Sequence, residues 1–596
     1  MNLATAQRRH TPRRFRTLSA ALFVCAALAA GLIAAVFAAL PRGFDLTDEG
    51  FYLNNILSPS LYPRLSQFGF VLNPVFEFLG RDIILFRYFG FLLLILFSLP
   101  VFFKILRLFE DEIGNFSSLK FIACALTFGS ASILFYSLWL PTAGYNDLNI
   151  YGASLVAAGI IPRSGLALPA GRSAKAIGPL ISDSALVAVG LALCFLAKPT
   201  TAAVLAVLVL VAGAAMGRLS SVMLAGGIAG ALVLGALLAI DSSPIAVFEQ
   251  YARALDLKNV IKDGHELSSL LAIPLNVADK SKLFFLYVAV GFSLILTVLV
   301  GLEAWWSKSI GGSIFALMAM SIASAIWLYN VDSSSGFVTL TIPLFAVTCV
   351  VWLLATLRYR TDEQPNWRLL GIACIVMLIP IAVGFGSNSH ILKSAGRAGV
   401  FWVAGTLMFI AALTRGALAH NFIVAIALVS SLATLRVVVD GYLNPYRLLA
   451  PLWAQTEWVS IRDDRHWIRV DPTTATYLRT LREAAKSHGF TGGTPIIDLT
   501  GMSPGTVYAL GGTPIGAAWL FGGYPRSWDF AMQALARVPR AELERAWVLS
   551  APDGHRHIDT SVLGRLGLSF PRGYSEIVQI KTGYADELHV LWKPAP

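Results

Sequence analysis

Long apolar runs recur through the first 440 residues of the chain, and they constrain its fold more than any other feature. Crossing ~30 Å of hydrocarbon takes ~20 residues as an α-helix. Helix is the form we expect, because a lone segment in lipid must satisfy its own backbone hydrogen bonds. The predicted spans are 18–40, 82–104, 119–140, 146–161, 180–197, 199–216, 221–240, 283–302, 311–329, 337–357, 368–386, 398–413 and 419–436. The sequence therefore predicts an all-α polytopic membrane domain over residues 1–440, with about thirteen transmembrane helices.

The composition excludes a soluble globular chain. Of the 596 residues, 56% are hydrophobic and 14% are charged, whereas soluble domains carry ~25% charged residues. The formal net charge is +11. Most Lys and Arg lie at the ends of apolar segments, where they orient spans in a bilayer, so we expect no nucleic acid partner. The five cysteines all fall inside apolar segments without a CxxC pair, which argues against a metal site built from them.

The N-terminal segment predicts the orientation in the membrane. The apolar stretch 17–40 is longer than the ~7–15 residues of a signal peptide, so it predicts an uncleaved first span. Positive residues mark the cytoplasmic side, and five of them precede this span: Arg8, Arg9, Arg13, Arg14 and Arg16. An odd number of spans then places loops 41–81 and 241–282 and the C-terminal domain outside. We expect a multi-pass protein of a bacterial inner membrane.

Beyond Asp440 the composition becomes that of a globular domain. Helical segments such as 472–487 and 528–538 alternate with strand-like segments, which are 496–499, 546–550, 575–580 and 587–592. This alternation predicts a C-terminal extracytoplasmic α/β domain over residues 441–596.

Acidic residues follow the first span directly. Asp45, Asp48 and Glu49 lie in the segment DLTDEGFYL, which the topology places in water near the membrane. One interpretation is an interfacial helix capped by Thr47, with the acids complementing the dipole at its N-terminus. The other is a general base, because a carboxylate near an apolar wall has its pKa raised toward useful values. The residues alone favour neither interpretation.

This loop resembles that of the GT-C superfamily, whose members are polytopic glycosyltransferases that use lipid-phosphate-linked sugars. The similar features are an acidic pair followed by an aromatic residue (DEGFY, 48–52), a long outer loop, and Arg87 at the mouth of the second span. The superfamily includes the protein O-mannosyltransferases and the lipid A aminoarabinose transferases. The resemblance implies that Asp48 is the catalytic base on the acceptor, with Glu49 beside it. It implies neither the sugar nor the acceptor, because Gly50 and Phe51 stand where the lipid A enzymes have a basic residue.

The second outer loop, PTAGYNDLN, places Tyr145 and Asp147 at the start of a span. GT-C enzymes often carry a second acidic or amide site in this loop, which binds substrate and, in the oligosaccharyltransferases, a metal. The resemblance thus implies that Asp147 completes a catalytic site with Asp48. An ordinary helix cap is the alternative. The superfamily contains enzymes with and without a divalent cation, so the cofactor is either such a cation or none.

Cations near the outer face suit a lipid phosphate. Lys198 lies in a hairpin between two apolar stretches, where Pro199 breaks the helix. Its side chain either snorkels to the membrane surface or binds a phosphate. The loop 386–397 is dense in donors, and the loop 241–282 carries cations on a predicted amphipathic helix, a pattern also typical of a helix lying on lipid. The candidate substrate-binding residues are Arg87, Tyr145, Lys198, His265, Asn388, Lys393 and Arg397.

The C-terminal domain offers weaker signals. The segments 498–512 and 519–529 are glycine-rich turns after predicted strands, a position where α/β domains bind ligands, although such turns often serve only to reverse the chain. His555 and His557 are two residues apart in a polar loop, which is a poor indication of a metal site.

The resemblance, together with these residues, implies an inverting glycosyltransferase that moves a sugar from a polyprenyl-phosphate donor to a glycan, lipid or protein acceptor at the outer face of the membrane. Lys198 and Arg397, with Arg87 or Lys393, would stabilise the charge on the departing phosphate. The alternatives are a transporter or flippase of lipid-linked sugars, and a polysaccharide ligase or polymerase. Transporters usually show repeated halves and ionisable residues near the membrane midplane, whereas the polar residues of this chain share one face.

Overall fold

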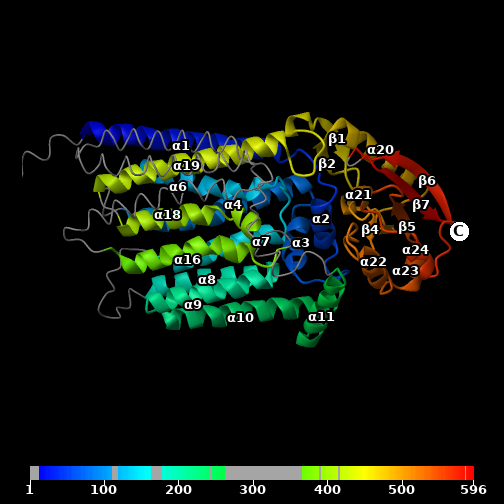
Figure 1. Ribbon diagram of the computed structural model, residues 1–596, viewed down its shortest axis with the longest axis horizontal. Helices are drawn as coiled ribbons and strands as arrows, with labels where there is room; N and C mark the ends of the chain where they lie inside the picture. The colour runs from blue at the N-terminus through cyan, green and yellow to red at the C-terminus, as the bar shows by residue number, and fades with distance from the viewer. Residues whose placement is uncertain are drawn as a thin grey trace, which may run out of the picture.

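The computed structural model describes residues 12–109, 118–162, 177–241, 243–261, 365–387, 391–413, 416–583 and 586–595. Figure 1 shows an elongated molecule, with a bundle of long helices at one end and a small sheet region at the other. Two short helices of the loop 41–81, α2 (Asp48–Leu57) and α3 (Phe68–Phe78), lie between the bundle and the sheet region.

The bundle consists of apolar helices, named here in chain order. They are α1 (Pro12–Ala39), α4 (Ile83–Arg107), α6 (Ser118–Gly129) with the 3-10 helix η2 (Ser130–Ser137), α7 (Tyr145–Ile160), α8 (Ile177–Ala197), α9 (Pro199–Ala215), α10 (Leu219–Asp241), α16 (Trp367–Gly384), α18 (Val400–Leu413) and α19 (Gly416–Leu443). Among the described residues, six segments are long and apolar enough to cross a membrane: Leu22–Ala39, Ile83–Arg107, Ser118–Ser137, Leu219–Asp241, Trp367–Gly384 and Phe422–Leu443. Two further helices are α11 (Pro244–Val260), which follows α10, and the short α17 (Ile391–Gly396), which follows α16.

Every predicted span that falls on described residues coincides with a helix. The ranges 283–302, 311–329 and 337–357 lie outside the described residues, so the number of about thirteen spans stays a prediction. The part of the loop 241–282 that is described forms α11, and the rest of that loop lies outside the described residues.

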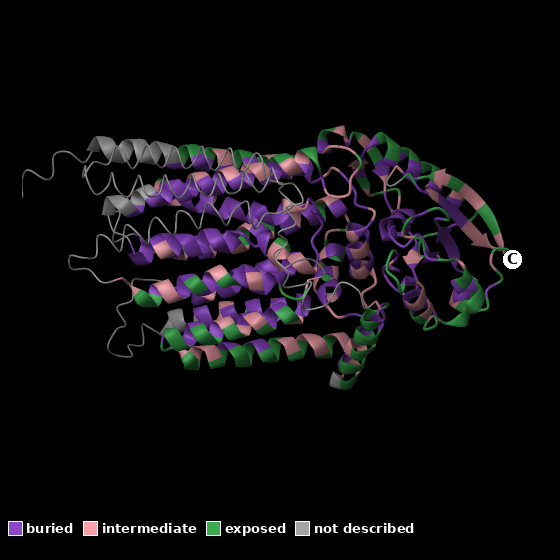
Figure 2. Ribbon diagram, in the orientation of Figure 1, coloured by how far each residue is buried: buried purple, intermediate pink, exposed green. Residues whose placement is uncertain are grey.

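Small residues allow the central helices of the bundle to approach closely. A Cβ added at Gly152 of α7 would lie 2.6 Å from the Gly190 carbonyl oxygen of α8, and one added at Gly159 would lie 2.4 Å from a methyl of Val187. Close backbone packing of this kind replaces the hydrophobic drive that helices lack in lipid. By contrast, α10 lies at the edge of the bundle and exposes apolar side chains along much of its length (Figure 2).

The C-terminal region, residues 444–595, contains two sheets. Strands β1 (Glu457–Ser460) and β2 (Trp467–Val470) pair antiparallel. The larger sheet has the order β4-β3-β5-β7-β6, with parallel pairs among β3, β4 and β5 and antiparallel pairs from β5 to β7 to β6. Its strands are β3 (Pro495–Asp498), β4 (Thr513–Pro514), β5 (Trp547–Ser550), β6 (Tyr574–Lys581) and β7 (Leu588–Pro594).

Helices pack around these strands: α20 (Pro472–Ser487), α21 (Pro504–Leu510), α22 (Ser527–Leu535), α23 (Arg540–Glu544) and α24 (Ser561–Arg565), with the 3-10 helix η6 (Leu452–Ala454) leading in. The four predicted strands and the two predicted helices are confirmed. Short strands β1, β2 and β4 and helix α21 were not predicted, because two to seven residues give too little periodicity to recognise.

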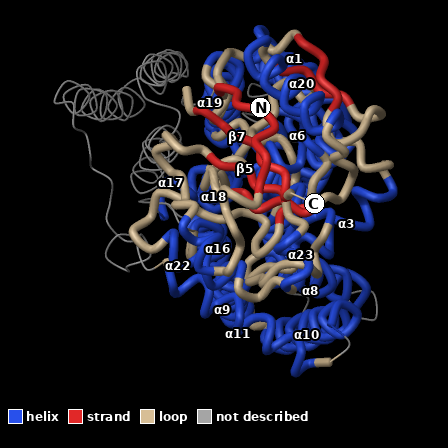
Figure 3. The backbone as a smooth tube through the Cα atoms, turned by 90° about the vertical axis from the view of Figure 1, so that its right-hand side faces the viewer, coloured by secondary structure: helices blue, strands red, loops and turns tan. Residues whose placement is uncertain are grey.

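The C-terminal region docks on the loop 41–81 through backbone groups. Gly505 of α21 donates its N–H to the Leu46 carbonyl at 2.8 Å, and the Asn54 side chain of α2 donates to the Pro504 carbonyl at 3.0 Å. A Cβ added at Gly50 would lie 2.2 Å from the Gly505 Cα, so α2 and α21 touch backbone to backbone. Seen from the C-terminal end, the strands lie over the helices of the bundle (Figure 3).

Candidate functional site

A network of hydrogen bonds within the loop 41–81 fixes the start of α2. Asp45 is buried, and its carboxylate accepts bonds from the Thr47 N–H at 3.0 Å, the Thr47 hydroxyl at 2.7 Å and the Glu49 N–H at 3.3 Å. Thr47 does stand at the N-cap position, but its hydroxyl makes no capping bond. Thr47 is therefore the N-cap residue by position, but the predicted capping bond to its hydroxyl is wrong. The Asp45 carboxylate accepts the backbone N–H of Glu49 instead.

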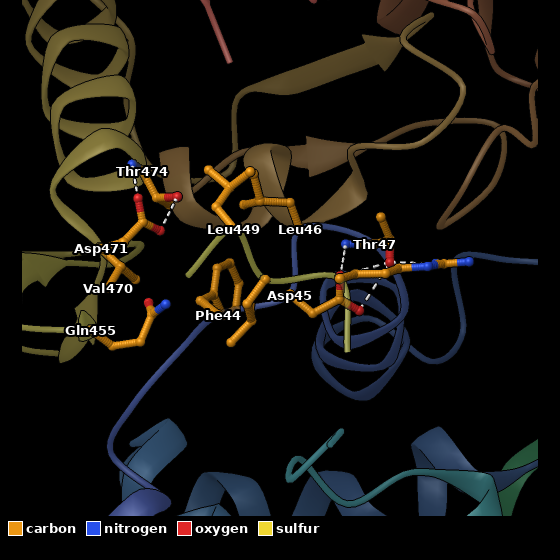
Figure 4. A pocket seen from close by; sticks show the side chains of 11 residues that line it. Phe44, Asp45, Leu46, Thr47, Leu449, Gln455, Val470, Asp471 and Thr474 are labelled. Atoms are coloured by element: carbon orange, nitrogen blue, oxygen red, sulfur yellow. Dashed lines mark hydrogen bonds between the residues drawn. The ribbon is translucent and has the colours of Figure 1, made fainter. Parts of the chain in front are cut away.

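The surroundings of Asp45 also perturb its protonation. Burial, followed by the neighbouring charge of Asp48, raises the pKa of Asp45 to about 7, and the bonds from Thr47 oppose that shift. Figure 4 shows Asp45 and Thr47 beside a small pocket where the loop meets the C-terminal region. Its volume of ≈ 20 Å³ is close to that of one water molecule, so this pocket is too small for a sugar.

Glu49 forms a buried ion pair with Arg87. The Arg87 Nη2 lies 2.6 Å from Glu49 Oε1, and neither side chain is more than 1% exposed. Thr142 donates a hydrogen bond to the same Glu49 oxygen, and Arg87 also donates to the carbonyls of Leu40 and Gly43 at 2.6 and 2.8 Å. These bonds tie α2 to α4 and to the end of α1.

Two expectations change with this geometry. Glu49 was expected to assist catalysis and Arg87 to bind substrate, but their polar groups are enclosed and bonded to each other. Neither lines the two large cavities described below. We therefore assign the pair to holding α2 in place, a role in which loss of one partner leaves a buried charge uncompensated.

Asp48 differs from its neighbours because its side chain is 29% exposed. Its Oδ2 accepts hydrogen bonds from Arg447 Nη1 at 3.0 Å and from the Tyr446 hydroxyl at 3.1 Å. The Arg447 guanidinium also lies 4.8 Å from the centre of the Tyr446 ring. The other oxygen, Oδ1, accepts no hydrogen bond from the described residues, so one oxygen of the carboxylate is held and the other is available.

An apolar cavity of ≈ 520 Å³ adjoins Asp48 on one side. Aromatic side chains from α2, α3 and the C-terminal region form much of its wall, and α9 and α11 close it farther away. Its apolar lining residues include Phe51, Phe68, Leu257, Ile261, Trp519, Phe521 and Phe530. A wall of this composition suits an acyl or isoprenoid chain together with the flat face of a sugar.

A smaller cationic cavity of ≈ 320 Å³ is also lined by Asp48. The basic residues that line it are Lys393, Arg397, Arg447 and Arg556. The two cavities share residues, so they are contiguous around the carboxylate: Asp48, Tyr52, Tyr145, Ser387, Trp519, Phe521 and Tyr524 line both. We call Trp519, Phe521 and Tyr524 the aromatic wall.

Lys198 lies in the wall of the apolar cavity rather than in water. It is 8% exposed, and its Nζ donates to Ser387 Oγ at 2.7 Å and to the Val383 carbonyl at 3.1 Å. Pro199, the next residue, ends the preceding helix and begins α9. The Lys198 amine therefore lies between α9 and the end of α16. The snorkelling interpretation therefore does not describe Lys198, because its amine is bonded inside the protein.

The predicted second acidic site is not brought to the cavities. Asp147 is buried in the first turn of α7, accepts a bond from the Gly144 N–H at 2.8 Å, and lines neither cavity. This is the helix-cap alternative. Tyr145, by contrast, lines both cavities. No group of three or more acidic, His or Cys side chains suited to a metal occurs in the part of the chain that is described.

The remaining predicted residues divide between those in place and those not described. Lys393 and Arg397 both line the cationic cavity, as expected for residues that bind an anion. His265 and Asn388 lie outside the described residues.

Sequence reasoning missed the residues that reach Asp48 from far along the chain. Tyr446 and Arg447 stand about 400 residues away from it in an unremarkable polar stretch that follows the last predicted span. The aromatic wall and Arg556 belong to segments that drew attention only for their glycines and histidines. Burial in a shared cavity is a property of the fold, so no local sequence pattern predicts it.

The arrangement suits general base catalysis. A carboxylate with one fixed and one available oxygen lies between an apolar cavity and a cationic cavity, with Lys198 and Ser387 at their margin. Comparison with protein-family models, with curated proteins and with solved structures found no match to this chain.

Proposed function

We propose that this protein is an inverting glycosyltransferase that moves a sugar from a polyprenyl-phosphate donor to a hydroxyl acceptor at the outer face of a bacterial inner membrane. The observation that carries the proposal is the position of Asp48, which lines both the apolar and the cationic cavity. A proton acceptor at that junction can serve two substrates that enter from different sides.

The donor is assigned to the apolar cavity. Its walls on α9 and α11 suit the isoprenoid chain, and the aromatic wall suits the sugar, since rings stack on the apolar faces of carbohydrates. Lys198 and Arg397 lie close enough for the charge of Arg397 to act on the Lys198 amine. A phosphate between these two cations would hold the sugar next to Asp48.

The reaction follows from these positions. The acceptor oxygen attacks the anomeric carbon from the face opposite the phosphate, and Asp48 Oδ1 takes the proton of the acceptor hydroxyl. The bond between the anomeric carbon and the phosphate oxygen breaks, and its electron pair leaves with the polyprenyl phosphate. Lys198 and Arg397 stabilise the negative charge that grows on that phosphate, where cations contribute most to the rate. The product has inverted configuration.

Arg447 and Tyr446 act through Asp48 in this scheme. By bonding Oδ2 they keep the carboxylate in one orientation, so Oδ1 is directed to the substrates. Both follow α19, at the point where the chain leaves the bundle for the C-terminal region. The docking of that region therefore helps to set the orientation of the base.

The test is a transfer assay with purified full-length protein in proteoliposomes, supplied with a panel of polyprenyl-phosphate sugars and candidate acceptors. Asp48→Asn keeps size and hydrogen bonding but removes the basic oxygen, so turnover should fall at least ~100-fold while the lipid donor still binds. Asp256→Asn is the matched control, because Asp256 is exposed on α11 and lines neither cavity. Near-normal transfer by Asp48→Asn would remove it as the base. Lipid-linked sugar that crosses the bilayer with no transfer to any acceptor would favour the flippase instead.

A further inference from the structure

Four cations from three separate parts of the chain line the cationic cavity. Lys393 and Arg397 belong to the segment of α17, Arg447 follows α19, and Arg556 lies in a loop of the C-terminal region after β5. Asp48 is the single carboxylate among the described residues of this cavity, so the side chains carry a formal excess of three positive charges. Like charges around a small enclosed space repel one another, and a bound anion offsets that repulsion.

The loop that carries Arg556 is held in place by the two glycine-rich turns. A Cβ added at Gly501 would lie 1.9 Å from the Arg556 carbonyl oxygen, and one added at Gly522 would lie 1.7 Å from it. Ile558 also donates its N–H to the Leu499 carbonyl at 2.9 Å. Only residues without a Cβ permit this contact, so both turns serve to seat the loop beneath the aromatic wall.

The two histidines of this loop make hydrogen bonds that hold the loop in place. His555 Nδ1 lies 2.5 Å from Glu587 Oε1, and His557 Nδ1 lies 2.5 Å from the Gly554 carbonyl oxygen. They therefore fix the loop on either side of Arg556. An arginine whose backbone is already fixed loses less conformational entropy when it binds a ligand than one on a mobile loop.

We propose that the cationic cavity binds an anionic group of the acceptor, a phosphate monoester or a carboxylate, between Arg556 on one side and Lys393 on the other. The volume of ≈ 320 Å³ suits a charged sugar and is too small for a polyprenyl chain as well. The donor phosphate is assigned to Lys198 of the apolar cavity and to Arg397, which lines the cationic cavity, so Lys393 and Arg556 remain for the acceptor anion. The assignment of this anion to the acceptor rests on the proposed function, but the binding of an anion can be measured without any transfer.

The experiment measures the binding of three soluble sugars to the full-length protein in phosphatidylcholine nanodiscs by isothermal titration calorimetry. The probes are glucose 6-phosphate, glucuronate and glucose, which differ in charge. At least one of the two anions should bind about tenfold or more tightly than glucose, and Arg556→Ala should reduce that affinity by about tenfold or more, because hydrogen bonds to charged groups are the strong ones. The preferred anion tells phosphate from carboxylate.

The control is Arg565→Ala, which removes an exposed arginine of α24 that lines neither cavity and should leave binding unchanged. If Arg556→Ala does not fold, Arg556→Lys, which keeps the charge but loses the bidentate fork, should bind with intermediate affinity. Equal affinity for all three sugars, or full affinity in Arg556→Ala, overturns the proposal.

Two further outcomes separate this proposal from the function it rests on. If undecaprenyl phosphate displaces glucose 6-phosphate competitively, the cavity is the donor phosphate site and the assignment to the acceptor is wrong. If anions bind through Arg556 but no donor supports transfer, the anion site stands and the glycosyltransferase proposal fails.

Discussion

Replacement of Gly50 by alanine tests the contact on which the whole site depends. The new Cβ would lie 2.2 Å from both the Cα and the N of Gly505, whereas ordinary contacts begin at 3.4 Å. Both neighbouring atoms are backbone, so no side chain can move aside, and α2 and α21 must separate by about 1 Å or more.

The expected loss of stability follows from the bonds that span this contact. Separation stretches the bond from Gly505 N to Leu46 O, now 2.8 Å, and the bond from Asn54 to the Pro504 carbonyl, now 3.0 Å. Each such bond contributes about 0.5–1.5 kcal/mol, and forcing an extra methyl into a packed contact costs about 1–3 kcal/mol. We therefore expect the docked C-terminal region to lose about 2–6 kcal/mol of stability in Gly50→Ala.

The assay is thermal unfolding of the full-length protein in nanodiscs, followed by limited proteolysis at the junction after α19. Gly50→Ala should unfold about 5 °C or more below the wild type and should be cut faster between α19 and β1. Gly564→Ala is the control, because nothing lies within 4 Å of a Cβ at that helical position. Identical unfolding of all three proteins would refute the backbone contact between α2 and α21.

Three other predictions concern single charged residues. Lys198→Ala should weaken use of the lipid donor, measured as transfer rate against donor concentration, with Arg397→Ala acting in the same direction; unchanged kinetics in both would move the phosphate elsewhere. Glu49→Gln should lower the thermal midpoint, because Arg87 is left as a buried charge at a cost of about 3–5 kcal/mol, yet it should reduce turnover less than loss of the base does; a larger loss of turnover at full stability would make Glu49 catalytic after all. For Asp45, whose pKa in the fold is about 7 against ~3.9 in an unfolded chain, the folded state holds the proton longer, so stability should fall as the pH rises from about 4 to 7. Asp45→Asn should flatten that slope in thermal unfolding across the same range, and an unchanged slope would assign it to another group.

The sequence predicted those parts of the fold that depend on long local patterns. Apolar runs of about twenty residues gave helices, and the segments around β3, β5, β6 and β7 gave strands, because burial on one face or on both imposes a regular spacing. The orientation of the helices in a membrane and the placement of the C-terminal region outside remain predictions. A reporter fused after Asp440, active only outside the cytoplasm, would test both.

The candidate site was predicted less completely, for geometric reasons. Asp48 and Glu49 are adjacent in sequence, and together they looked like a catalytic pair. On a helix, adjacent residues point in directions about 100° apart. Asp48 therefore faces the cavities while Glu49 faces Arg87 in the interior. Arg447 and Arg556 could not be predicted, because they reach the site only through the docking of the C-terminal region.

That docking has a consequence for how the protein is made. Asn54 and its partner Pro504 are 450 positions apart, and at ~5–20 residues per second a ribosome needs roughly 20–90 s to pass from one to the other. Throughout that interval α2 has been synthesised, but the aromatic wall and Arg556 do not yet exist, and Arg447 is added only toward its end. A partly synthesised chain thus carries Asp48 before the two cavities around it are complete. On the proposed function, a product truncated before Trp519 lacks the aromatic wall and Arg556 and is expected to be inert.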